Sequence, residues 1–197
     1  QVFGNGVLVP HGNGQIHYLN VETGNRLMHP FQPTLGPGES VDWRRPATVP
    51  GDPPQFVATD GQRKVFRVGI KENPRHLAAL AEVDMNVAIH GALAVAGDTV
   101  YGVDRRENRD VVISFQLSDL AQGKNEWELE GRTEWGPEMV GDMVLVGDQN
   151  SLHCFQTEQT RRWKKPLAYG PITGTPLAFG EHLVLASMEG VVWWINA

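Results

Sequence analysis

The sequence predicts an all-β fold in which one four-stranded antiparallel unit is repeated about five times. The main observation is a glycine followed by Asn, Asp or Glu that recurs every 39 to 47 residues, with a short apolar strand close behind each copy. These glycines are Gly4, Gly51, Gly97, Gly141 and Gly180. The 22 glycines and 13 prolines among short strands also favour turn-rich all-β structure. A four-stranded repeat of about 40 to 45 residues is typical of a β-propeller blade.

The clearest copy of the repeat runs from Pro137 to Trp163. Gly, Asp and Asn, which supply the backbone conformations of tight turns, separate its apolar runs. We expect a Gly141-Asp142 turn, a strand at 143–146, a polar turn at 148–151, a strand at 152–155 and a last strand that ends at Trp163.

The spacing of the repeated glycines divides the whole chain into five blades, which we number one to five in chain order. Their approximate ranges are 1–29, 44–81, 87–129, 132–165 and 171–197. Blade one is expected to begin within its first strand and to have an outer strand near 25–28. A Pro- and Gly-rich connection at 30–43 follows, and loops of that length often carry binding functions. Blade five is expected to stop after its third strand.

Two segments have more than one interpretation. Residues 74–80 contain Ala and Leu, which favour helix, but the repeat places an outer strand there, and we follow the repeat. The turn at 104–110 carries three arginines and three acids. Such a balanced charge run is typical of a solvated loop, and the alternative is a binding site for an acidic partner.

The repeat resembles the PQQ-like repeat of quinoprotein alcohol dehydrogenases and their non-enzymatic relatives, a β-propeller family. The matching segments are 22–24 (Glu-Thr-Gly), 97–101 (Gly-Asp-Thr-Val-Tyr), 123–127 (Gly-Lys-Asn-Glu-Trp) and 187–193 (Ser-Met-Glu-Gly-Val-Val-Trp). The resemblance implies a propeller over the whole chain. Because roughly seven or eight blades are usual in this family, we expect an incomplete arc of a larger propeller. A closed five-bladed ring is the alternative.

The enzymes of this family bind pyrroloquinoline quinone beside a disulfide of adjacent cysteines, with calcium held by acidic and Asn side chains. This chain has a single cysteine, Cys154, and no acid or Asn that matches the calcium motif. We therefore assign no catalytic, cofactor-binding or metal-binding residue and expect no cofactor. The expected function is a non-catalytic module for protein or ligand binding. The alternative is an incomplete piece of a PQQ-dependent oxidoreductase.

Other candidate sites favour structural interpretations. The seven histidines lack metal-binding spacing, and His17 and His153 share one register of the repeat. Asp148 begins a segment like a calcium loop, but the required Gly and Glu are missing, which predicts a hairpin turn. Cys154 lies in an apolar strand and is expected to be a small buried hydrophobe.

The tryptophans are expected to serve blade packing for the most part. Trp127 and Trp163 fall on outer strands, and Trp193 and Trp194 fall on a third strand. A bulky aromatic in a repeat is more often part of the core than a ligand platform. Two others precede blades and are candidates to line a surface; they are Trp43 and Trp135.

Net charge and composition narrow the choice of partner. The net charge of −6 argues against nucleic acid, and no apolar run is long enough to span a membrane. The family resemblance implies a periplasmic or extracellular bacterial protein. We expect a protein partner and a homo-oligomer formed through blades one and five. Apolar residues are expected on their free faces, such as Leu8, Ile16, Val192 and Trp194.

Overall fold

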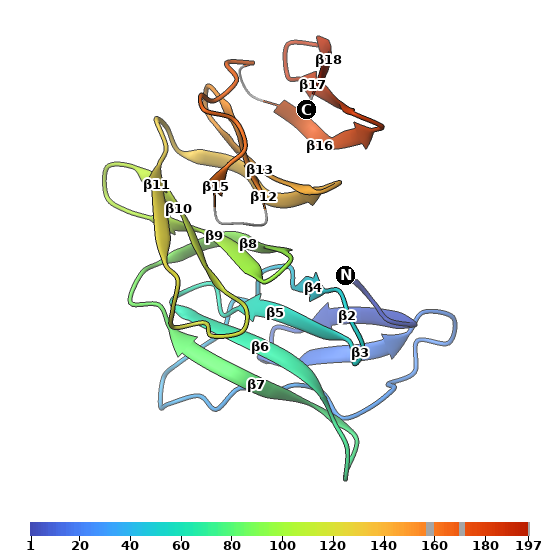
Figure 1. The fold of residues 1–197 in the computed structure, drawn as a ribbon. Helices are drawn as coiled ribbons and strands as arrows, with labels where there is room; N and C mark the ends of the chain where they lie inside the picture. The colour runs from blue at the N-terminus through green and yellow to red at the C-terminus, as the bar shows by residue number, and fades with distance from the viewer. Residues whose placement is uncertain (157–159, 170–171, 197) are drawn as a thin grey trace.

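A computed structural model describes residues 1–156, 160–169 and 172–196 of the chain. Within these residues the regular structure consists of strands, arranged as five antiparallel sheets that follow one another along the chain. Figure 1 shows the sheets placed side by side along a curved path from the N-terminus to the C-terminus. The predicted all-β class is confirmed. The predicted limits of blade five, Pro171 and Ala197, lie outside the described residues.

Each sheet is a meander in which consecutive strands pair. Blade one contains β1 (Val2–Phe3), β2 (Gly6–Pro10) and β3 (Ile16–Asn20). Blade two contains β4 (Ala47–Val49), β5 (Gln55–Thr59), β6 (Lys64–Lys71) and β7 (His76–Asp84). Blade three contains β8 (Ile89–Ala96), β9 (Thr99–Arg105), β10 (Asp110–Gln116) and β11 (Asn125–Glu128). Blade four contains β12 (Thr133–Val140), β13 (Met143–Asp148), β14 (Leu152–Gln156) and β15 (Thr160–Arg161). Blade five contains β16 (Ile172–Phe179), β17 (His182–Ser187) and β18 (Val192–Asn196).

The repeated glycine lies between the first two strands of each blade. It begins a two-residue turn in four blades, whereas Gly51 of blade two lies in a longer connection at 50–54. At Gly97 and Gly141 the backbone φ is 60° and 65°, in the left-handed region. A side chain is strained in this conformation, whereas glycine adopts it freely. The repeat of glycine in the sequence therefore reflects a repeated turn geometry.

Most predicted strands are present, including the ambiguous one. Residues 74–80 contribute to strand β7, which pairs with β6 as the repeat predicted. Two outer strands are shorter than expected. In blade one the outer strand is reduced to a bridge between Leu19 and Arg26. In blade four β15 ends at Arg161, so Trp163 lies beyond it.

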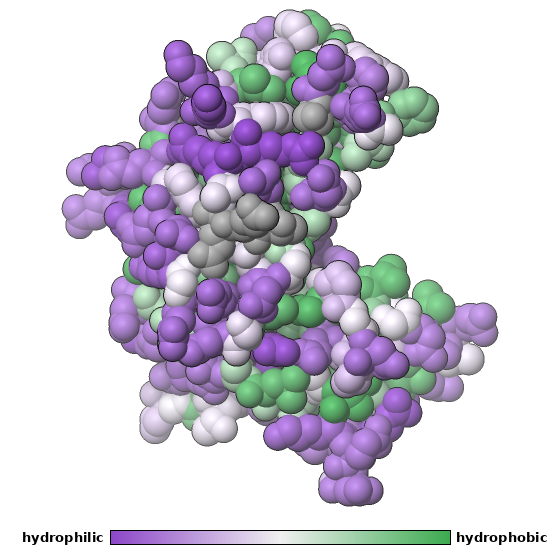
Figure 2. Space-filling view, viewed as in Figure 1, coloured by the Kyte–Doolittle hydropathy of each residue, from purple (hydrophilic) through white to green (hydrophobic). Residues whose placement is uncertain are grey.

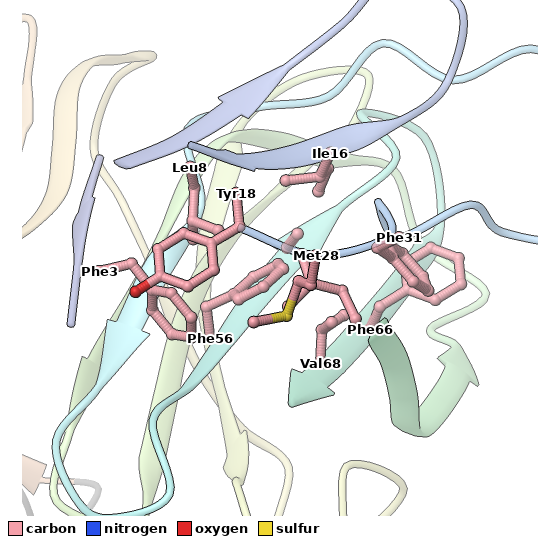
Figure 3. Packing of buried hydrophobic residues seen from close by; sticks show 11 residues of the cluster. Phe3, Leu8, Ile16, Tyr18, Met28, Phe31, Phe56, Phe66 and Val68 are labelled. Atoms are coloured by element: carbon pink, nitrogen blue, oxygen red, sulfur yellow. The ribbon is translucent and has the colours of Figure 1, made fainter. Parts of the chain in front are cut away.

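The hydrophobic core lies between neighbouring sheets, since each interior strand sends alternate side chains to opposite faces. Blades one and two share a cluster in which Phe3 packs edge-on against Tyr18 and Phe56, with ring centroids 5.1 and 5.4 Å apart (Figure 3). Similar clusters join blades two and three, three and four, and four and five. Five sheets are thus held together by four successive interfaces in the described part of the chain.

The sheets form an open arc and do not close into a five-bladed ring. Extensive contacts between sheets join neighbours along the chain, as between β12 and β8 or β12 and β16. Blades one and five lie at opposite ends of the arc in Figure 1, and the space-filling view in Figure 2 is hollowed between them. Among the described residues, one face of each terminal blade is therefore without a neighbouring sheet.

Candidate functional site

The face of blade five that lies opposite to blade four exposes several large apolar side chains. Leu183 and Leu185 point toward blade four, where both are almost fully buried. Side chains of the opposite register point away from blade four. They form the surface that we call the blade-five face: Thr173, Leu177, Phe179, His182, Val184, Ala186, Val192, Trp194 and Asn196.

Four large apolar side chains dominate the blade-five face, and each is more than half exposed. Their exposed fractions are 65% for Leu177, 66% for Phe179, 68% for Val192 and 58% for Trp194. The Trp194 ring lies 5.6 Å from that of Phe179 and 5.3 Å from that of His182, measured between centroids. In Figure 2, green apolar patches lie among hydrophilic residues over the part of the molecule that Figure 1 labels β16 to β18. The face contains no Asp, Glu, Lys or Arg.

The outer face of blade one is smaller and more covered. Its side chains are those of Val2, Val7, Val9, His17 and Leu19. Val2 is 69% exposed, but His17 is buried and the other three are half-buried. This outer face therefore offers less apolar surface than the blade-five face.

The prediction that Leu8 and Ile16 lie on the outer face of blade one is wrong. They are 1% and 0% exposed and belong to the cluster shared with blade two. The register of β2 with β3 turns both toward that neighbour, together with Tyr18. The predictions for Val192 and Trp194 are confirmed, since both lie exposed on the blade-five face.

His17 has a structural setting, as its place in the repeat predicted. Its Nε2 lies 3.0 Å from Oε1 of Gln15, and its ring lies 4.6 Å from that of His11. Burial, together with the positive charge of Arg26 and the neighbouring His11, lowers the pKa of His17. Neutral His17 fits a packed position in blade one.

The concave side of the arc is a second candidate surface. An ion pair of 3.3 Å joins Arg45, before β4, to Glu138 on β12, and so bridges blades two and four. Two cavities of about 140 and 260 Å³ are both lined by this pair. Trp135 lines the larger cavity, as predicted for a surface tryptophan. Trp43 lines neither of these two cavities, because its ring packs against the rings of Phe31 and Phe66.

The arginines of the charged turn are paired within the chain. Arg105 contacts Asp110 at 3.0 Å, and Arg109 contacts Glu128 at 2.5 Å. Arg106 lies 2.7 Å from Asp104 and 2.6 Å from Glu126. These pairs occupy the arginines within the chain, which argues against a site for an acidic partner. The turn is not fully solvated, because Asp104 and Asp110 are 3% and 0% exposed.

Asp110 is the buried centre of a network between blades three and four. Its carboxylate accepts hydrogen bonds from Arg105, from Arg132 at 2.8 Å and from the backbone N–H of Thr133 at 2.8 Å. Burial alone would raise the pKa of Asp110, but these hydrogen bonds outweigh it and lower the pKa to about 2. The carboxylate therefore stays ionised and connects the two blades.

Asp148 closes a hairpin, as predicted, and its oxygens are occupied. One oxygen accepts the backbone N–H groups of Asn150 and Ser151 at 2.9 and 2.7 Å. The other lies 2.9 Å from Nε2 of the buried His153. Although burial opposes it, hydrogen bonding from His153 and the turn lowers the pKa of Asp148. This arrangement is that of a turn rather than a calcium loop.

Cys154 is a buried hydrophobe, as expected. Its side chain lies in the cluster shared by blades four and five and is 1% exposed. Burial raises the pKa of its thiol to about 12. Since the thiolate is the reactive species, this cysteine is poorly suited to nucleophilic chemistry.

The described residues offer neither a metal cluster nor a membrane-spanning helix. In the ranges that the structure covers, His, Cys, Asp and Glu side chains form no group of three or more suited to a metal ion. The described part of the chain also has no helix of the length and hydrophobicity needed to cross a membrane.

Several solved structures share this arrangement of sheets. BamB from Moraxella catarrhalis superposes with a TM-score of 0.57 and 17% identity, over 99% of this chain and 59% of that chain. Hsv2 from Kluyveromyces lactis gives 0.63 and 11%, over 98% and 57% of the two chains. The WD40 domain of SCAP from fission yeast gives 0.53 and 12%, over 93% and 46%. The fold is a β-propeller.

This chain spans about half to three fifths of the length of each of these three structures. No protein-family model matches it, and no curated protein matches it in sequence. The resemblance to the PQQ-like repeat therefore stays a prediction from the residues. At sequence identities of 11 to 17%, the similarity to these structures shows the fold alone.

Sequence reasoning missed two of the four large apolar residues on the blade-five face. Leu177 and Phe179 lie in the first strand of blade five, for which the repeat gives no side-chain direction. Their pairing with Val184 and His182 places them on the same side as Trp194. The strands in 177–195 are apolar on both faces, so the sequence pattern does not separate these residues from the buried ones.

Proposed function

We propose that this propeller is a non-catalytic module that binds another protein through the free faces of its terminal blades. The observation that carries the proposal is the blade-five face, with its four exposed apolar side chains and no charged residue. Contiguous exposed apolar surface of this kind marks protein interaction sites in soluble proteins. Self-association through blades one and five is part of the proposal. The family resemblance favours a periplasmic or extracellular setting.

The choice of a protein over a small ligand rests on shape and chemistry. Small-molecule sites are concave pockets with a few convergent polar groups. The blade-five face is one side of a sheet whose apolar residues are aligned for packing against another surface. The exposed aromatic Trp194 also fits protein interfaces, in which aromatic residues are enriched.

Photo-crosslinking tests the binding proposal directly. A benzophenone amino acid replaces Phe179 on the blade-five face, or Val21 in the loop after β3 as a control of similar exposure, 66% against 67%. In cells that express the protein naturally, we expect discrete protein adducts from position 179 and none from position 21. Equal labelling at the two positions, or no adduct at position 179, would contradict the proposal.

Cofactor titration separates the module from the alternative, an incomplete piece of a PQQ-dependent oxidoreductase. Pyrroloquinoline quinone and calcium are added to the purified chain, and bound quinone is measured by its absorbance after gel filtration. We expect no saturable uptake. Saturable uptake near one quinone per chain would overturn the non-catalytic assignment.

A further inference from the structure

We propose that the larger cavity on the concave side of the arc binds a free α-amino acid as its zwitterion, with the carboxylate at Arg45 and the ammonium group at Glu138. This cavity is separate from the blade-five face, so the inference goes beyond the proposed function and does not rest on it. Its lining residues come from blades two, three and four. The site therefore does not depend on what packs against the terminal blades.

Two neighbouring β-bulges shape this cavity, which has a volume of about 260 Å³. The pairing register shifts within 90–94 of β8 and again within 135–138 of β12. Each bulge contains a glycine in the left-handed region, Gly91 with φ 75° and Gly136 with φ 82°. A Cβ on Gly91 would lie 3.6 Å from the carbonyl oxygen of Gly136, so the two bulges are adjacent. Bulges of this kind redirect side chains and are frequent beside functional sites.

Charges of both signs line the cavity. Arg45 and Glu138 contact each other at 3.3 Å, with 53% and 22% of their side chains exposed. Glu134 also lines the cavity and is exposed. An anionic ligand would face two carboxylates, and a simple cation would face the guanidinium group. The adjacent charges of a zwitterion match those of Arg45 and Glu138, and each would gain a charge-assisted hydrogen bond.

The Thr133 hydroxyl group is an unused donor at the same cavity. Thr133 is 8% exposed, and its Oγ1 is buried without a hydrogen-bond partner among the described residues. A buried hydroxyl group that makes no hydrogen bond destabilises the protein. An oxygen of the ligand carboxylate would accept its hydrogen bond.

His90 lines the cavity without adding a positive charge. Burial, together with the positive charge of Arg105, lowers the pKa of His90. The imidazole is therefore neutral near pH 7 and does not repel the ammonium group of the ligand.

Trp135 favours a ligand with an apolar side chain. It is half-buried and lines the cavity beside the charged groups. Small-molecule sites combine apolar or aromatic lining with a few polar groups that fix the orientation of the ligand. A neutral polyol would also find hydrogen-bond partners here, but it has no charges to pair with both Arg45 and Glu138. We therefore choose L-leucine and L-phenylalanine as probes.

Fluorine NMR of the purified chain labelled with fluorotryptophan tests the inference. Trp135→Phe identifies the resonance of Trp135, and we expect millimolar L-leucine to shift it saturably. Leucine amide lacks the carboxylate, N-acetyl-leucine lacks the ammonium group, and N-acetyl-leucine amide lacks both. Each should bind roughly ten-fold more weakly than L-leucine, because at least one charge-assisted contact is lost. No saturable shift with either L-leucine or L-phenylalanine, or equal binding of all four leucine compounds, would overturn the inference.

Two charge-removing variants test the named contacts. Arg45→Gln and Glu138→Gln should each weaken L-leucine binding by roughly ten-fold. Arg63→Gln is the matched control, because Arg63 is also exposed in blade two and pairs with Asp84 at 2.8 Å, but does not line the cavity. It should leave the affinity unchanged. Equal weakening by all three variants would contradict the assignment of Arg45 and Glu138.

Thr133→Val separates a binding role from a structural one. The substitution keeps the shape of the side chain and removes the unpartnered hydroxyl group. It should weaken L-leucine binding by roughly three-fold or more, while the Tm of the free chain stays equal or rises. Unchanged binding would remove Thr133 from the site. Crosslinking from position 179 is independent of these results, so failure of this inference and failure of the proposed function are distinguishable.

Discussion

The buried carboxylate of Asp110 shows how a single residue joins two blades. The sequence placed it at the end of a balanced charge run, which predicted a solvated turn. The structure buries its side chain completely, because Arg132 and Thr133 of the following blade bond to it. These partners lie 22 and 23 residues away. Local charge patterning does not reveal contacts at that separation, so this part of the structure was not predictable from the sequence.

Acid sensitivity is the expected consequence. The pKa of Asp110 falls from 3.8 to about 2 on folding, so its stabilisation is complete above about pH 4 and is lost as the pH falls toward 2. The shift corresponds to about 2 kcal/mol. Urea unfolding of the native chain and of Asp110→Asn between pH 2 and 6 measures this contribution. The variant should show a weaker pH dependence over that interval.

The exposed Asp52 provides the comparison for this measurement. Asp52→Asn should keep the pH dependence of the native chain. If Asp110→Asn and the native chain lose stability in parallel as the pH falls, the ionised carboxylate of Asp110 does not stabilise the folded state.

At the scale of single strands, the position within the repeat predicted secondary structure better than the intrinsic propensity of the residues did. It placed β7 over residues that favour helix, because pairing with β6 outweighs the small intrinsic preference of Ala and Leu. The repeat did not predict which side chains of blade one face blade two. Both faces of a blade are apolar, so alternation separates Leu8 from Val7 but does not say which of them meets a neighbouring sheet.

The turn glycines give a prediction at this scale. Gly97→Val and Gly141→Val should each destabilise the fold by about 1 kcal/mol or more, because both positions have positive φ. Gly12→Val is the control, because Gly12 is not in the left-handed φ region and has open space where a Cβ would lie. Thermal melting followed by circular dichroism compares the three variants. Equal melting temperatures for all three would argue against the shared turn geometry.

At the scale of the whole molecule, the four interfaces act in series. Blade five packs on blade four through residues such as Leu183 and Leu185, and the two terminal blades make no extensive contact with each other in the described chain. In a linear array of this kind, stability is approximately a sum of repeat and nearest-neighbour terms. The number of blades in the sequence predicted this series. The degree of opening of the arc depends on packing angles that a single sequence does not specify.

Hydrogen exchange tests the serial arrangement. Leu185→Ala removes a side chain that is 1% exposed at the last interface, and such truncations cost about 2 to 5 kcal/mol. We expect amides of β17 and β18 to lose at least ten-fold more protection than those of β5 and β6. Mass spectrometry of peptides from each blade gives the comparison. A uniform loss over the chain would show that the five sheets unfold as one cooperative unit.

The restriction of extensive contacts to neighbouring sheets also bears on how such a chain can change in evolution. Duplication of a gene segment of about 45 codons would insert one further sheet. The new sheet would need only two faces that match the ones on either side, and the other interfaces would keep their residues. A closed ring would have to change its curvature at every joint to admit the same insertion. The open arc can therefore lengthen by one unit at a time while it remains folded.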